Sequence, residues 1–177
     1  LQLRATLSGP HARVQNSSGQ TLSVNVTVKP GDGNLKVVFN PNSTLNDENA
    51  LAQVSAFYNV NSDYVFLQSR KLTTKEMDES PIIVRTNIDA ECNAYYTPGR
   101  PSLNFFKSSD NCVNSSYATV SRHEYGHYWD DMTGGIVNGG ASEGWGDIVS
   151  MYSLGNPIIG EHFLKRPRPG PDGKLTD

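Results

Sequence analysis

Several features are missing from this sequence, and each absence excludes a class of protein. No apolar run reaches 18 residues, so no segment is typical of a membrane-spanning helix. Lys and Arg number 15 against 18 Asp and Glu, and no basic patch indicates nucleic-acid binding. No signal peptide is visible and the first residue is not Met, so we expect a mature or excised chain. We expect neither a membrane nor a nucleic acid as partner.

Cysteine is also scarce, with only two residues among 177. Cys92 and Cys112 stand too far apart for a zinc-ribbon pattern, which leaves either a disulfide or two free thiols. The composition is rich in Asn, Ser and Gly and poor in Lys, which favours a secreted protein and therefore the disulfide. The length allows one domain, or two small lobes around a shared cleft, with a sizeable core.

The first part of the chain is predicted to combine strands with one helix. Residues 21–29 alternate apolar and polar side chains, as a half-buried strand does, and 35–39 form a second short apolar run. The glycine-containing turn at 31–34 predicts that these two strands form a hairpin. Apolar residues at helical spacing then predict a helix over about 47–70, broken near 59–63.

Three more strands are predicted after a polar connection at 71–80. The run 81–88 is rich in β-branched residues, which is typical of a buried strand. Residues 93–96 and 102–106 are shorter strands, and the Pro-Gly turn at 98–101 joins them. These strands complete a lobe of mixed β-sheet and helix.

Helical periodicity returns after this lobe. Ser115 or Ser116 is expected to cap a helix that ends near Met132, before a pair of glycines. A second helix is predicted from about 141 to 154, and the Pro-rich residues that follow show no packing pattern. The predicted fold class is α+β, with three parts: an N-terminal β-rich lobe (1–113), a helical segment (114–155) and a Pro/Gly-rich tail (156–177).

The first predicted helix of this segment contains the motif His-Glu-x-x-His from His123 to His127. Two His four residues apart lie on one face of a helix, roughly 6 Å apart along its axis. Two imidazoles at that spacing can bind one tetrahedral Zn²⁺, and Glu124 between them would stand beside the metal-bound water. The alternative is a surface helix that carries two His and a Glu without a metal.

A catalytic zinc site needs a third protein ligand. Glu143 lies sixteen residues after His127, at the start of the second predicted helix, with enough chain between them to turn and face the first helix. Asp147 is one helical turn further and is placed to accept the second ring N–H of a ligand His. Two other candidates have no motif around them: Glu161 and His162.

These residues predict the chemistry of a zinc hydrolase, with one Zn²⁺ per chain. Zinc would lower the pKa of its bound water and polarise a scissile carbonyl. Glu124 would take the proton of that water and pass it to the leaving amine. Calcium stays open as a second metal, and its candidate ligands are Asp110, Asp130 and Asp131.

The two motifs together resemble those of the gluzincin zinc metallopeptidases. Glu143-Gly144-Trp145-Gly146-Asp147 is similar to the second motif of the fungalysin group and of the bacterial thermolysin-like peptidases. The resemblance implies a zincin-like α+β fold, in which a mixed lobe precedes the zinc-binding helix and a mainly helical lobe follows it. It also implies a secreted endopeptidase, with zinc ligands His123, His127 and Glu143, the general base Glu124, and Asp147 orienting His123.

The resemblance extends to the segment that begins at Cys92, which is similar to the Asn-Ala-aromatic rim of the thermolysin-type cleft. It implies that Asn93 and Ala94 bind the backbone of a protein or peptide substrate along an edge strand. The chain departs from the family where an oxyanion-stabilising Tyr is expected, because residues 136–138 are Ile, Val and Asn. It also ends at Asp177, so we expect that the C-terminal helical lobe with the downstream His is truncated, as a missing partner portion.

Two alternatives to an active endopeptidase remain. The first is a catalytically impaired fragment or a non-catalytic zinc-binding interaction module, which the missing helical lobe favours. The second is a β-rich surface or adhesion module in which the motif is accidental. Zinc content separates the second alternative from the rest, and proteolysis sensitive to a chelator separates the first.

Overall fold

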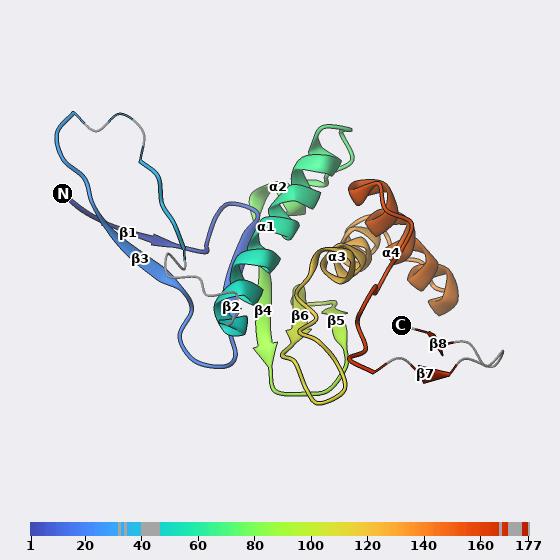
Figure 1. Cartoon of the computed structure of the whole chain (residues 1–177). Helices are drawn as coiled ribbons and strands as arrows, with labels where there is room; N and C mark the ends of the chain where they lie inside the picture. The colour runs from blue at the N-terminus through green and yellow to red at the C-terminus, as the bar shows by residue number, and fades with distance from the viewer. Residues whose placement is uncertain (32, 34, 40–46, 167, 170–174, 177) are drawn as a thin grey trace.

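The computed structural model describes residues 1–31, 33, 35–39, 47–166, 168–169 and 175–176, and it has the predicted α+β fold (Figure 1). The strands are β1 (Gln2–Thr6), β2 (Ala12–Asn16), β3 (Ser23–Thr27), β4 (Ile82–Ile88), β5 (Ala94–Thr97), β6 (Ser102–Phe106), β7 (Arg168–Pro169) and β8 (Leu175–Thr176). The helices are α1 (Glu48–Gln68), α2 (Lys75–Glu79), α3 (Ala118–Met132) and α4 (Gly139–Leu154). No helix among these residues is long and apolar enough to span a membrane.

A four-stranded sheet in the order β2-β4-β6-β5 forms the centre of the molecule. β4 runs parallel to both β2 and β6, whereas β5 is antiparallel to β6 and forms one edge of the sheet. α1 packs on β2 and β4, while α3 packs on β6 and β5 and lies beside α1. α4 packs on α3 on the side away from the N-terminal ribbon of β1 and β3 (Figure 1).

The core lies between this sheet and the two helices. Ile82 and Val84 alternate along β4 on the buried face, as the period of a strand requires. α1 contributes buried residues at helical spacing, including Val60 and Leu67, and α3 contributes Tyr125. Full burial of one such aliphatic side chain contributes about 1.5–3 kcal/mol, so this core holds α3 firmly against the sheet.

α1 is a continuous helix, and the predicted break near 59–63 is wrong. Two polar residues of this stretch, Asn59 and Asp63, are buried and have partners. Asn59 Nδ2 donates to Ser55 Oγ at 3.3 Å, and Asp63 forms a buried ion pair with Arg122 of α3. The helix begins after Asp47, whose side chain accepts a hydrogen bond from the backbone N–H of Ala50.

Two further predictions in the N-terminal part are wrong. Residues 35–39 form no strand; β3 pairs instead with β1, in antiparallel register from Gln2 opposite Thr27 to Thr6 opposite Ser23. The proposed turn at 31–34 includes residues 32 and 34, which lie outside the described residues. The polar connection at 71–80 contains the short helix α2, because the Thr74 side chain caps its start and Met77 is buried.

The predicted cap of α3 is also wrong, because both candidate serines are buried elsewhere. Ser115 Oγ accepts a hydrogen bond from the backbone N–H of Phe106 at 2.8 Å, and Ser116 is 2% exposed. α3 therefore begins at Ala118 without a side-chain cap. The predicted end at Met132 is confirmed, and α4 begins at Gly139 with the Asn138 side chain as its cap.

The predicted disulfide is confirmed between Cys92 and Cys112. It joins the segment before β5 to the loop after β6, next to the cleft edge. The returning C-terminal chain lies against this loop, because Val113 N donates to Phe163 O at 3.0 Å. β7 and β8 form an antiparallel pair in the predicted tail, although part of that tail lies outside the described residues. The division into three parts stays a prediction.

Candidate metal centre

The position of α3 is held by a buried ion pair with α1. Arg122 Nη1 lies 2.9 Å from Asp63 Oδ1, and the two side chains are 8% and 1% exposed. The same nitrogen donates to the backbone carbonyl of Ser153 at the end of α4, at 3.2 Å. Arg122 therefore connects α1, α3 and α4 immediately beside His123.

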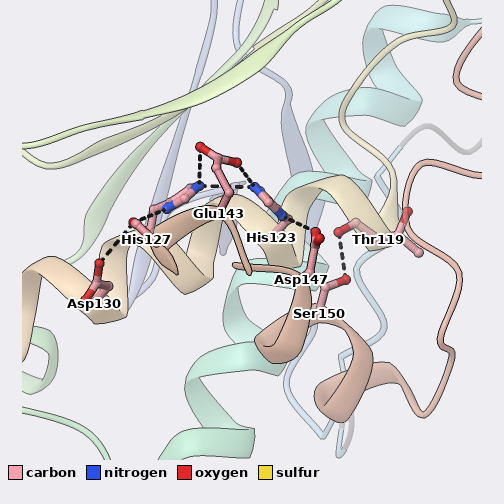
Figure 2. A network of polar contacts seen from close by, with 8 residues as sticks. Thr119, His123, His127, Asp130, Glu143, Asp147 and Ser150 are labelled. Carbon is pink, nitrogen blue, oxygen red and sulfur yellow. Dashed lines mark hydrogen bonds and ion pairs between the residues drawn. The ribbon is translucent and has the colours of Figure 1, made fainter. Parts of the chain in front are cut away.

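α4 approaches α3 closely through two glycines. An ideal Cβ at Gly126 would lie 2.9 Å from Gly146 Cα, and one at Gly146 would lie 2.8 Å from Cε1 of His123. Ser150 of α4 adds a hydrogen bond to the carbonyl of Thr119 at 2.8 Å (Figure 2). The sequence motifs contain both glycines, but their spacing does not reveal that they face each other.

The close approach brings the three predicted ligands together (Figure 2). Nε2 of His123 lies 3.1 Å from Nε2 of His127 and 3.2 Å from Oε2 of Glu143. Nε2 of His127 lies 3.7 Å from Oε1 of Glu143. Among the described residues, this is the one group of three or more His, Cys, Asp and Glu whose ligand atoms lie within 4.8 Å of one another.

These distances fit a zinc ion. Zinc binds His nitrogen and carboxylate oxygen at about 2.0–2.2 Å in tetrahedral geometry, which places neighbouring ligand atoms roughly 3.4 Å apart. The two His nitrogens lie 3.1 Å apart, and each lies near a different oxygen of the Glu143 carboxylate, at 3.2 Å (Oε2) and 3.7 Å (Oε1), which are all separations around that value. Two nitrogens and one oxygen also leave a fourth position, which is the donor set of a catalytic zinc site.

Asp147, which the sequence predicts to orient a ligand His, lies in contact with the first imidazole. Its Oδ1 lies 2.8 Å from Nδ1 of His123, one helical turn from Glu143 on α4. An ionised carboxylate only accepts hydrogen bonds, so Nδ1 of His123 carries the proton and the lone pair of Nε2 faces the ligand group.

The second imidazole has a partner that the sequence did not suggest. Nδ1 of His127 lies 3.2 Å from Ser142 Oγ, and Ser142 Oγ donates to Asp130 Oδ2 at 3.1 Å (Figure 2). Burial lowers the pKa of His127, and the neighbouring His123 lowers it further. The neutral imidazole favoured in this way is the form that binds a metal.

Glu124 is buried on α3 between the two His residues. Its side chain is 6% exposed, and burial raises its pKa to about 7. The charge of His123 and a backbone hydrogen bond from Tyr96 oppose that increase, whereas Glu143 adds to it. A divalent cation among the three ligands would lower this pKa again, because it stabilises the carboxylate.

A cleft of about 620 Å³ opens over these residues and includes both predicted rim residues, Asn93 and Ala94. Tyr96 OH donates to Asp131 Oδ2 at 2.6 Å, which ties the edge strand β5 to α3. The residues lining the cleft include four carboxylates and no Lys or Arg, so its charge favours a cation. The carboxylates are Glu124, Asp130, Asp131 and Glu143.

The other residues that the sequence singled out do not join the group of three candidate ligands. Glu161 and His162 line a separate hollow beside the start of α1. Asp110, Asp130 and Asp131 do not form a metal-binding group among the described residues, which leaves the calcium prediction without support. In the region 136–138, Ile136 lines the cleft, Val137 is fully exposed, and Asn138 caps α4.

Comparison with known proteins gives a fold relative but no sequence relative. No protein-family model matches the chain, and no curated protein matches it. In fold it is similar to the precursor of protealysin, a metalloproteinase from Serratia proteamaculans, with a TM-score of 0.63 at 16% sequence identity. The similarity covers 97% of this chain and 58% of that one, so the chain spans less than two thirds of the precursor's length. At this identity the similarity shows a shared fold, and the resemblance to the fungalysin group stays a prediction.

Proposed function

We propose that this chain is a zinc-dependent endopeptidase of gluzincin type that acts on protein or peptide substrates. The observation that carries the proposal is the convergence of His123, His127 and Glu143 at separations suited to one zinc ion. Both imidazoles have an outward Nδ1 partner, which favours an inward Nε2 lone pair. The fold shared with a metalloproteinase precursor supports the same conclusion.

The mechanism assigns separate tasks to the residues of the cleft. Zinc, when bound, supplies a Lewis acid that acidifies water and polarises a carbonyl. Glu124 takes a proton from the attacking water and delivers it to the leaving amine. Burial raises its pKa and a bound cation opposes that rise, so the carboxylate can be ionised at the working pH and still accept a proton.

The edge strand β5 is proposed to hold the substrate backbone. Within the described sheet, β5 pairs only with β6, and its residues line the cleft beside Glu124. An extended peptide can add to such an edge through backbone hydrogen bonds. Asn93 and Ala94 are the proposed contacts, and the disulfide at Cys92 anchors the start of this rim.

We also propose that the protein works outside the reducing cytosol. The bond between Cys92 and Cys112 supports this location, because disulfides persist in oxidising compartments. A secreted peptidase would meet its protein substrates there.

One observation favours the alternative of a catalytically impaired chain. Of residues 136–138, Ile136 is the one that lines the described cleft, and its side chain is apolar and offers no hydrogen-bond donor. Loss of one oxyanion donor typically lowers the rate roughly 10²–10³-fold. In this alternative the chain binds zinc as tightly as an active peptidase would, but it hydrolyses peptides slowly.

Zinc analysis combined with a proteolysis assay tests the proposal. We expect one zinc per chain, and casein hydrolysis that a chelator stops and added zinc restores. Glu124→Gln should keep the zinc and lose about 10²–10⁴ in kcat/KM, because only the general base is removed. Absence of zinc, or equal hydrolysis by Glu124→Gln, would contradict the mechanism, whereas zinc without any hydrolysis would support the impaired alternative.

A further inference from the structure

We propose that Asp130 is a positioning residue of the metal centre, which acts on His127 through the hydroxyl of Ser142. The inference deepens the proposed function, since it assumes that His127 is a metal ligand. It concerns a carboxylate that no motif in the sequence marks.

Asp130 is buried, so a negative charge on it needs partners that stabilise it. The residue is 8% exposed and lies near the C-terminal end of α3. None of the ion pairs that Lys or Arg forms in the described part of the chain involves Asp130. A buried carboxylate is costly unless it is hydrogen-bonded and near a positive charge. Ser142 provides the hydrogen bond, and a divalent ion held by His127 would provide the charge.

The donors and acceptors along the path from Asp130 through Ser142 to His127 follow from the chemistry of the three side chains. An ionised carboxylate has no proton to give, so Ser142 must donate its single hydroxyl proton to Asp130. Ser142 Oγ can then only accept from Nδ1 of His127, at 3.2 Å. When Nε2 of His127 binds a cation, the ring proton therefore lies on Nδ1, where Ser142 accepts it.

The same contact without Asp130 would leave the tautomer undecided. A serine hydroxyl can donate as well as accept, so Ser142 alone could bind the Nδ1 lone pair and place the proton on Nε2. That tautomer cannot bind a metal through Nε2. Asp130 therefore favours one tautomer of His127 through Ser142, as Asp147 does for His123 by direct contact.

Matched variants at two positions distinguish this positioning role from a role in packing alone. Asp130→Ala frees the Ser142 hydroxyl, and Ser142→Ala removes the acceptor for Nδ1. Asp130→Asn keeps an oxygen that can accept from Ser142, and Ser142→Thr keeps the hydroxyl, so both should retain most of the function. Asp110→Asn, at an exposed loop position, is the matched control for loss of one negative charge.

Two measurements on the full chain decide the question. Competition with a chromophoric chelator gives the zinc dissociation constant, which should rise about 10–100-fold in Asp130→Ala and Ser142→Ala. The ring ¹⁵N shifts of His127 in the zinc-depleted chain report its tautomer directly. We expect a larger fraction of the Nδ1–H form in the parent and in Ser142→Thr than in Asp130→Ala.

The outcomes distinguish this inference from the proposed function. If the parent binds zinc but Asp130→Ala and Ser142→Ala keep its affinity and the His127 tautomer, the inference is wrong and the peptidase proposal stands. If the parent binds no zinc, the proposed function fails, and the role of Asp130 at the metal fails with it. A loss of affinity in Asp110→Asn equal to that in Asp130→Ala would show a general charge effect and overturn the inference.

Discussion

The two helices that meet at the metal centre differ in how the protein supports them. α3 contacts α1, β5, β6 and α4, whereas the main contact of α4 within the described residues is α3. The ligand side chains reflect this difference, because His123 and His127 are 15% and 14% exposed while Glu143 is 68% exposed. The buried half of the site, with two of the three candidate ligands, therefore lies on α3, and the exposed half lies on α4, which depends mainly on one interface.

The comparison shows where the geometry of the site is most easily lost. The positions of the two imidazoles relative to each other follow from one helical turn of α3. The position of Glu143 depends instead on the contact between Gly126 and Gly146 and on a few hydrogen bonds between the helices. Changes to α3 should therefore act on the whole fold, and changes to the interface should act first on the third ligand.

The largest effect is expected where α3 is anchored. Asp63→Asn leaves the buried Arg122 without its ionic partner, and breaking a buried pair in this way typically costs about 3–5 kcal/mol. Burial raises the pKa of Asp63 to about 7, so denaturant unfolding at about pH 8.5, where the parent carboxylate is ionised, measures the loss. The matched surface pair of Asp89 and Lys107 is the control, and Asp89→Asn should cost at most about 1 kcal/mol. Equal losses in the two variants would contradict the distinction between a buried anchor and a surface contact.

A smaller effect is expected at the interface between the helices. Gly126→Ala would place a methyl group 2.9 Å from the Gly146 backbone, so α4 must shift at an expected cost of about 1–3 kcal/mol. Zinc affinity should fall together with stability, because Glu143 moves with α4. Gly144→Ala is the matched control on α4, since no atom lies within 4 Å of its added Cβ. It should instead stabilise the chain by about 0.5–1 kcal/mol, and destabilisation by both variants would argue against a close interface.

The pH dependence of hydrolysis tests the buried half of the site. Glu124 acts as a base only when ionised, and burial raises its pKa from 4.5 to about 7 in the absence of a cation. Since a bound cation lowers that pKa, the acid limb of kcat/KM should lie below pH 7. Activity should then decrease about tenfold for each pH unit below the limb. A profile that stays flat from pH 7 down to 4 would show that Glu124 is not the base.

The smallest effect is expected from a single hydrogen bond between the helices. Ser150→Ala removes the donor to the Thr119 carbonyl, and one such bond contributes about 0.5–1.5 kcal/mol. Thermal unfolding should register this loss with zinc affinity almost unchanged, since Arg122 still holds the end of α4. A loss of zinc affinity as large as that of Gly126→Ala would mean that hydrogen bonds, and not close packing, place Glu143.

Much of the site could be predicted from the sequence, because its key spacings are short. His123 and His127 share a helical face whatever the rest of the fold does, and Asp147 follows Glu143 by one turn for the same reason. The strand β4 was predictable from its β-branched run, and β5 and β6 were predicted as short strands on either side of a Pro-Gly turn. The continuity of α1 was not, since Asp63 looks like a break until Arg122 is placed beside it.

By itself, then, the sequence determined which residues share a face, because the periods of helix and strand act between near neighbours in the chain. Only the tertiary structure decided which faces meet. The pairing of β3 with β1, the contact of Gly126 with Gly146, and the path from Asp130 through Ser142 to His127 all join separate elements. Such contacts depend on packing between elements distant in the sequence, and no local pattern encodes them.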